Sequence, residues 1–213
     1  MIEAITRQSL EQKDKPKLSM KRSYRHSQWY TEPGRVKDTF QGYLKEIDGR
    51  VLDAGCSTGE TTIELSNIYP NSHIYGVDNN PELIGLANEN LDSRPNRDSL
   101  KVSFHHGDFY RLKDILPSNK FGVAFAMNNW LFASLRLSDE ENGFIARQFN
   151  YVLSEGGLLF LSKDNKSHLM RKEGHFKAIF RKSGLGFEEV HVDRELSYEN
   201  GCDRIIDICN SLN

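Results

Sequence analysis

The chain has few cysteines and no long hydrophobic run. Its 213 residues include three cysteines, Cys56, Cys202 and Cys209, an odd number without paired spacing. This pattern argues against a disulfide framework or a zinc site and favours reduced thiols in the cytoplasm. No apolar run approaches the ~20 residues that a membrane helix needs, and the N-terminus lacks the apolar core of a signal peptide. We therefore expect a cytoplasmic protein without a membrane partner.

A strong net charge is also missing. The 28 Lys and Arg residues face 30 Asp and Glu residues, so the net charge is −2. The chain as a whole therefore lacks the basic character typical of nucleic-acid-binding proteins. Residues 1–23 carry a local excess of positive charge, which we interpret as a solvated tail rather than as a contact for an anionic partner. We predict an N-terminal arm and substrate cap at residues 1–35 and one folded domain at residues 36–213.

What the sequence does contain is a regular alternation of strand and helix patterns. The expected strands are 50–55, 73–78, 101–108, 121–127, 156–163, 186–196 and 203–210. The expected helices are 35–47, 59–69, 80–91, 111–116, 138–153 and 167–184. Repeated strand–helix units indicate a parallel sheet with helices on both faces, and the short turn before the last strand indicates an antiparallel hairpin. We predict an α/β fold with seven strands, mostly parallel, and a C-terminal antiparallel hairpin.

Acidic residues follow three successive expected strands. Asp53 lies in the stretch "VLDAGCSTGE", and Asp78 and Asp108 end the next two strand patterns. In open α/β sheets, ligands bind beyond the carboxyl ends of the strands. Gly55 permits a sharp turn there, and we expect Gly59 to let the next helix approach a ligand without an intervening Cβ. The three carboxylates together can bind an ammonium group, a ribose and an amino-purine.

The spacing of the glycines separates two kinds of nucleotide ligand. A dinucleotide fingerprint has the form G-x-G-x-x-G, whereas Ser57 occupies its second glycine position here. This disfavours a nicotinamide-dependent oxidoreductase. Each acid also has a local alternative role: Asp53 or Asp78 as a helix cap, and Asp108 as an ordinary turn residue. We prefer a shared ligand site because the three acids occur in register.

Five stretches resemble the ordered motifs of class I S-adenosylmethionine-dependent methyltransferases. They are "VLDAGCSTGETTIEL", "IYGVDNNPELIGLA", "FHHGDF", "FGVAFAMNNW" and "LSEGGLLFLS", within a resemblance that covers residues 36–213. The resemblance implies a Rossmann-like fold, methyltransferase activity and S-adenosylmethionine as cofactor. It implies that the methionine part is held by the turn that contains Asp53, Gly55, Cys56, Ser57 and Gly59. It further places Asp78 and Asn79 at the ribose, Asp108 and Phe109 at the adenine, and Met127 and Asn128 near the sulfonium.

The acceptor side of the site is less defined by the sequence. Methyl transfer from a sulfonium is an in-line displacement, so positioning supplies most of the catalysis. We predict His26, Tyr30 and Asn128 as catalytic residues, with a surface position as the alternative for His26. Asp164 and Asn165 are similar to the metal-binding pair of catechol-type O-methyltransferases, but Asn128 replaces the further aspartate, so we predict no metal.

These features favour methylation of a small-molecule acceptor by a monomer or homodimer. A nucleic-acid partner is disfavoured, and no membrane partner is expected. The alternatives are a protein or RNA methyltransferase and a non-catalytic nucleotide-binding module.

Overall fold

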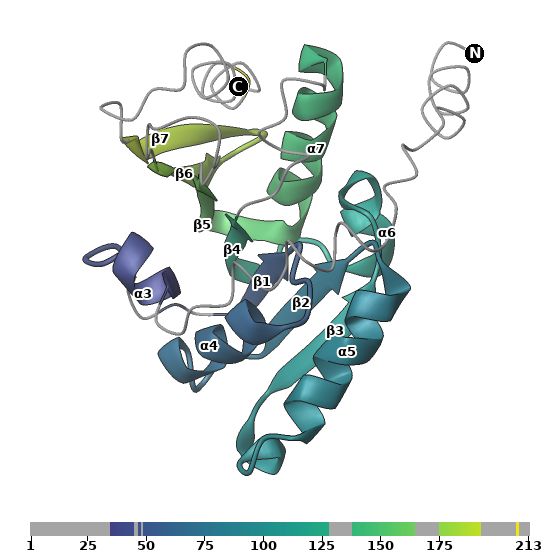
Figure 1. Ribbon diagram of the computed structural model, residues 1–213. Coiled ribbons are helices and arrows are strands. Elements are labelled where there is room, and N and C mark those ends of the chain that lie inside the picture. The colour runs from purple at the N-terminus through teal and green to yellow at the C-terminus, as the bar shows by residue number, and fades with distance from the viewer. Residues whose placement is uncertain are drawn as a thin grey trace, which may run out of the picture. The chain divides into compact units, whose positions relative to one another are not determined.

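The computed structural model describes residues 35–44, 47, 49–127, 138–164, 175–192 and 208. These residues contain a seven-stranded sheet with the strand order β3-β2-β1-β4-β5-β6-β7 (Figure 1). The strands are β1 (Arg50–Ala54), β2 (Ile74–Asp78), β3 (Val102–His106), β4 (Phe121–Met127), β5 (Leu153–Asp164), β6 (His175–Ser183) and β7 (Gly186–Val192). Strands β1 to β5 pair in parallel, whereas β6 is antiparallel to β5 and β7 is antiparallel to β6. The predicted Rossmann-like fold class is confirmed.

Helices lie on both faces of this sheet (Figure 1). They are α3 (Arg35–Thr39), α4 (Glu60–Ile68), α5 (Pro81–Asp92), α6 (Leu112–Ile115), α7 (Asp139–Val152) and the 3₁₀ turns η1 (Arg97–Ser99) and η2 (Phe109–Arg111). Alternate residues of β1 point to opposite faces. Val51 packs in a core cluster with residues of α3, α4 and α5, while Leu52 packs in a second cluster with residues of α6 and α7. No described helix combines the length and the apolar character needed to cross a membrane.

Two helix starts follow from local sequence signals. Asn80 caps α5, because its Oδ1 accepts a hydrogen bond of 3.0 Å from the Glu82 amide, and Pro81 occupies the first turn. Ser138 and Glu141 form a capping box at the start of α7, in which the side chain of each accepts from the backbone amide of the other. Both starts lie where the sequence predicted them.

The expected helix 167–184 is wrong at its C-terminal half, where His175–Ser183 form strand β6. Phe180 and Ile179 occur at helical spacing with Phe176, but in the structure they face opposite sides of the sheet and pair with Leu159 and Phe160 of β5. Burial between β5 and β7 therefore overrides the local helical pattern. The expected hairpin is formed instead by β6 and β7.

A two-residue turn, Gly184–Leu185, joins these two strands. Gly184 has φ 58°, and glycine in its position is typical of such tight turns. The expected strand 203–210 lies outside the described residues except for Ile208, which is helical and buried. The expected helix 35–47 is shorter than predicted and ends at Thr39.

Candidate functional site

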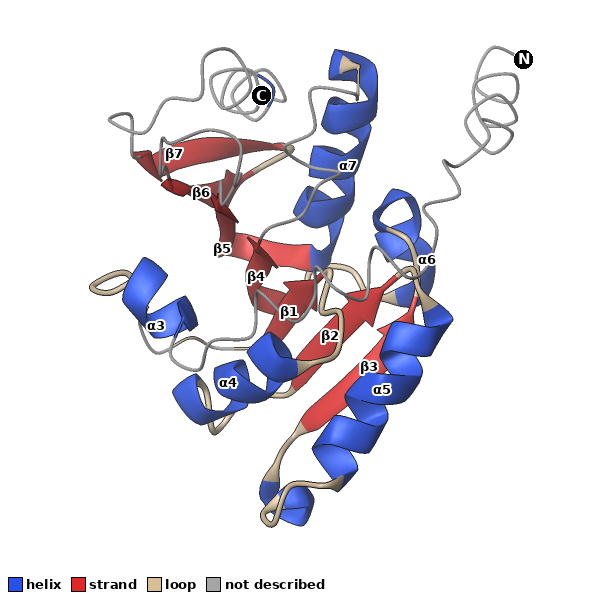
Figure 2. Ribbon diagram, in the orientation of Figure 1, coloured by secondary structure: helices blue, strands red, loops and turns tan. Residues whose placement is uncertain are grey.

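The carboxyl ends of β1, β2 and β3 lie side by side at one edge of the sheet (Figure 2), and Asp53, Asp78 and Asp108 lie at or just beyond these ends. Ala54 of β1 pairs with Val77 of β2, and Asp78 pairs with His106 of β3. The next neighbour of β1 is β4, so the strand order reverses beside Asp53. Ligands of open α/β sheets bind at such reversals.

The turn after β1 has an unusual backbone. Gly55, Ser57 and Gly59 have φ values of 84°, 50° and 84°, in the left-handed region that L-residues rarely adopt. Gly55 N and Cys56 N both donate to the Val77 carbonyl oxygen, at 2.7 and 3.1 Å. The left-handed residues turn the chain so that the amides of Gly55 and Cys56 reach β2 at Val77, while the Ser57 amide reaches the Asp78 carboxylate.

Gly59 has a packing role that the sequence did not predict. A Cβ at this position would lie 2.5 Å from Phe104 Cζ and 3.0 Å from the Ala87 Cβ. The absent side chain therefore makes room for the packing of α4 against β3 and α5. Close approach to a ligand is not needed to explain this glycine.

Asp53 is almost completely buried, with 2% of the residue exposed. Its Oδ2 accepts a hydrogen bond of 2.7 Å from Thr62 Oγ1 on α4. Burial raises the pKa of Asp53 to about 7, with further contributions from the carboxylates of Asp78 and Glu64 and an opposing one from the Thr62 hydrogen bond. Asp53 does not cap α4, whose N-cap Gly59 has no side-chain cap, so this local alternative is wrong.

The Asp78 carboxylate is fixed by the backbone around it. Its Oδ2 accepts from the Ser57 amide at 3.0 Å, and its Oδ1 accepts from the Asn80 amide at 2.9 Å. Burial raises the pKa of Asp78, while these amides and the nearby His106 lower it. Because Asn80 supplies the cap of α5, the capping alternative for Asp78 is also wrong.

Asp108 does have the local role that was its alternative. Its Oδ1 accepts from the Tyr110 amide at 3.1 Å and so caps η2, which begins at Phe109. This contact does not test a role at the adenine. Asn79 is exposed, and its carbonyl oxygen lies 3.2 Å from His106 Nε2.

The remaining predicted residues divide into described and undescribed ones. Cys56 is 4% exposed, and burial followed by the charges of Asp53 and Asp78 raises the pKa of its thiol, so the sulfur stays protonated. Met127 ends β4, where it is partly buried against the core. The predicted catalytic residues His26, Tyr30 and Asn128 lie outside the described residues.

Two residues that hold the site together were missed by the sequence reasoning. Thr62 orients Asp53, and Phe104 fills the space beside Gly59. The position of Thr62 in the first turn of an expected helix directly after a glycine-containing turn is a signal that could have identified it. Nothing in the local sequence indicates that Phe104 would contact Gly59, since the two residues lie on separate elements.

The side chains at this edge offer groups that can contact an organic cation. Ser57 Oγ is buried without a hydrogen-bond partner among the described residues, close to the carboxylate of Asp78 that its own amide contacts. Within the same part of the chain, no group of three or more His, Cys, Asp and Glu side chains is placed to hold a metal ion. An ammonium group and a ribose could use these carboxylates and this hydroxyl.

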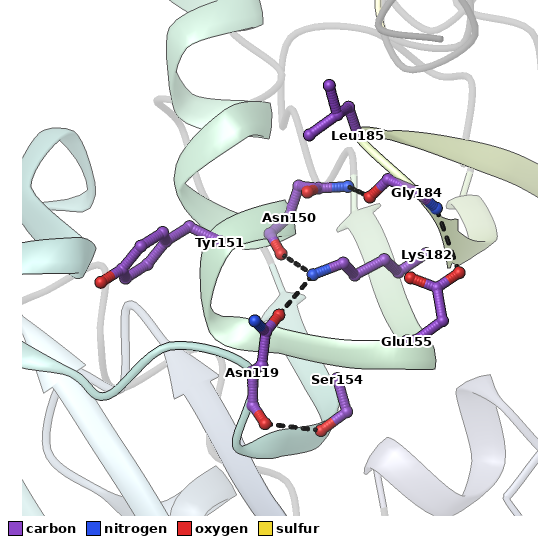
Figure 3. A pocket seen from close by; sticks show the side chains of 8 residues that line it. All are labelled: Asn119, Asn150, Tyr151, Ser154, Glu155, Lys182, Gly184 and Leu185. Carbon is purple, nitrogen blue, oxygen red and sulfur yellow. Dashed lines mark hydrogen bonds between the residues drawn. The ribbon is translucent and has the colours of Figure 1, made fainter.

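A hollow of about 650 Å³ lies elsewhere, at the amino-terminal ends of β4 and β5 (Figure 3). Lys182 lies at its centre and donates to Asn119 Oδ1, the Asn150 carbonyl and the Leu153 carbonyl at 2.6, 2.7 and 2.8 Å. All three ammonium protons are therefore used within the protein. The hollow contains none of the predicted site residues.

The chain matches a known family of protein domains. The sequence model of a family described as "Methyltransferase domain" matches residues 51–157, which is half of the chain. The matched segment runs from β1 into β5 and includes the whole edge described above. This match confirms the resemblance inferred from the sequence motifs.

Curated relatives share parts of this segment. Malonyl-[acyl-carrier protein] O-methyltransferase of Halalkalibacterium halodurans is 31% identical over 119 residues, covering 54% of this chain and 40% of the relative. Magnesium-protoporphyrin O-methyltransferase of Rhodobacter capsulatus is 46% identical over 59 residues, covering 28% of this chain and 24% of the relative. The chain thus matches less than half the length of these relatives.

Solved structures share the fold. A methyltransferase from Methanosarcina mazei superposes with a TM-score of 0.50 at 20% identity, covering 64% of this chain and 60% of the other. Geranyl diphosphate C-methyltransferase from Streptomyces coelicolor superposes with a TM-score of 0.50 at 12% identity, covering 70% of this chain and 53% of the other. With its sheet topology and its family match, the chain belongs to the class I S-adenosylmethionine-dependent methyltransferases, whose cofactor is S-adenosylmethionine.

Proposed function

We propose that this protein transfers a methyl group from S-adenosylmethionine to a small-molecule acceptor by in-line displacement. The observation that carries the proposal is the pair of buried carboxylates, Asp53 and Asp78, at the ends of adjacent strands on either side of a glycine-containing turn. The turn is held against β2 by the hydrogen bonds of Gly55 and Cys56 to Val77.

The described residues fit the cofactor in three places. Asp53 is a buried acceptor for the ammonium of the methionine part, and the Ser57 hydroxyl is a buried donor without a partner among the described residues. Asp78 is fixed through both oxygens by backbone amides, and its remaining lone pairs can accept from two ribose hydroxyls. Asp108 caps η2, which begins at Phe109, and we assign this segment to the adenine; Met127 ends β4, which pairs with β1.

These residues bind and orient the reactants. When bound, S-adenosylmethionine supplies an electrophilic methyl group on a sulfonium, and no metal is needed for that step. Rigid placement of the donor by the strand ends gives most of the rate enhancement in such a displacement. His26, Tyr30 and Asn128 remain our predicted catalytic residues, at which the acceptor would be positioned and, if it is protonated, would lose its proton.

The acceptor class rests on chain-level features and on relatives. The net charge of −2 does not favour a nucleic acid substrate. One relative is named for malonyl-[acyl-carrier protein] and another for magnesium-protoporphyrin. We propose a small-molecule acceptor, a cytoplasmic location, a monomer or homodimer, and a substrate cap formed by residues 1–35.

Two measurements test this function. Isothermal titration calorimetry should detect binding of S-adenosylmethionine and S-adenosylhomocysteine but not of NAD. Incubation with radiolabelled S-adenosylmethionine should then label a metabolite fraction rather than protein or RNA. Label in protein or RNA would support the alternative substrate classes, and cofactor binding without transfer to any pool would indicate a non-catalytic module.

A further inference from the structure

Asp53 is buried under conditions that disfavour its charged form. The residue is 2% exposed, and Thr62 provides its hydrogen bond of 2.7 Å. A carboxylate removed from water needs several donors or a cation to remain ionised. None of the ion pairs found within the described residues includes Asp53.

The charged neighbours of Asp53 add to this effect. Asp78 on β2 and Glu64 on α4 both act on it as negative charges, and the buried thiol of Cys56 lies in the same turn. Glu64 Oε1 accepts from the Val36 and Lys37 amides of α3, which fixes it near the site. His106 on β3 acts on Asp78 and not directly on Asp53. Together these causes raise the pKa of Asp53 to about 7.

We propose that Asp53 is a neutral carboxylic acid in the free protein below neutral pH, and that it releases its proton to solvent when the cationic amino-acid end of the cofactor binds. This inference rests on the cofactor site proposed above. The acid loses one proton, the carboxylate gains a charge-assisted contact with the ligand's ammonium, and no other bond is made or broken.

Proton release couples cofactor affinity to pH. A cation beside a carboxylate lowers the carboxyl pKa by ~1–3 units. The affinity should therefore increase as the pH rises towards neutrality. If the shift is ~2 units, the dissociation constant of S-adenosylhomocysteine falls about fivefold between pH 6 and pH 7. The ligand's own amine stays protonated over this range, so it does not contribute to the change.

The test is calorimetry at about pH 6 in two buffers that differ in ionisation enthalpy, such as phosphate and Bis-Tris. The difference in apparent binding enthalpy gives the number of protons released, and we expect ~0.8 per S-adenosylhomocysteine bound. Binding without proton release would overturn the inference while leaving the cofactor site intact. Failure of S-adenosylhomocysteine to bind at all would instead overturn the proposed function.

A matched ligand and a matched variant identify the source of the proton. 5′-Methylthioadenosine keeps the adenosine part but lacks the amino-acid end, so its binding should release almost no proton. Equal release with both ligands would show that the proton does not come from the methionine side. The variant Asp53→Asn should bind S-adenosylhomocysteine without proton release, and release that persists in this variant would contradict the assignment to Asp53.

Discussion

At the scale of single residues, the candidate site is built from side chains whose usual chemistry is altered by burial. Asp53 and Asp78 are carboxyl groups with raised pKa values, and Ser57 has a backbone conformation that favours glycine. Such features cost stability and are retained at functional sites. Two substitutions separate residues that bind ligand from residues that support the fold.

Replacing Asp78 with alanine should weaken adenosyl-ligand binding. The substitution removes a charged acceptor that the Ser57 and Asn80 amides hold in place. We expect a loss of ~1–3 kcal/mol in the binding free energy of S-adenosylhomocysteine, measured by calorimetry. Asp92→Ala, at an exposed position on α5, should bind normally. Unchanged affinity in Asp78→Ala would mean that the ribose lies elsewhere.

Replacing Gly59 with alanine should destabilise the fold rather than act on the ligand directly. The new Cβ would meet Phe104 at 2.5 Å, and φ is +84°. We expect a loss of ~2–4 kcal/mol in the free energy of unfolding, measured with urea. The matched control is Gly85→Ala in α5, where a Cβ meets nothing within 4 Å. This substitution should raise the free energy of unfolding by ~0.5–1 kcal/mol. Equal stability of the two variants would contradict this account.

At the scale of elements, local sequence signals predicted some parts and failed for others. The starts of α5 and α7 were predictable because a cap and the residues after it are contiguous in sequence. Strand β6 was not predictable in this way, because its partners in β5 are about 20 residues away and decide its conformation. For the same reason Asp53 and Asp78 were identified from the ends of strand patterns, whereas the contacts of Thr62 and Phe104 were not.

Lys182 joins three elements and should be needed for their packing. It links β6 to the last turn of α7 and to Asn119 before β4 (Figure 3). Lys182→Met keeps much of the side-chain volume but leaves the three oxygens without this donor. We expect the free energy of unfolding to fall by ~2–4 kcal/mol in urea denaturation. Arg181→Met, the exposed neighbour on the same strand, should change it by less than ~0.5 kcal/mol. A similar small effect at Lys182 would refute the structural role.

At the scale of the whole molecule, the site should make stability depend on pH. The pKa of Asp53 is about 7 in the folded protein and near its ordinary value of 3.8 when the chain is unfolded. Between these two pH values, the Asp53 carboxyl is protonated in the folded protein and ionised in the unfolded chain. The free energy of unfolding therefore falls as the pH rises from 3.8 towards 7, and the whole destabilising effect of Asp53 is present above about pH 7.

The variant Asp53→Asn removes this cost because its amide cannot ionise. Its stability relative to wild type should increase by ~2–3 kcal/mol between pH 5 and pH 8. Urea denaturation of both proteins at the two pH values measures this difference. Asp92→Asn, at an exposed position on α5, provides the control. Its stability relative to wild type should change by less than ~0.5 kcal/mol between the two pH values. A difference for Asp53→Asn that stays constant with pH would show that Asp53 does not change its protonation in the folded protein between pH 5 and pH 8, which contradicts this account.

The packing of Cys56 has a consequence for the chemical durability of the protein. Its sulfur lies inside the turn after β1 and stays protonated because burial and two neighbouring acids disfavour the thiolate. Oxidants and alkylating reagents attack the thiolate, so they would have to unfold this turn before they could modify it. The integrity of this thiol is thus maintained by the fold itself, whatever the redox state of its surroundings.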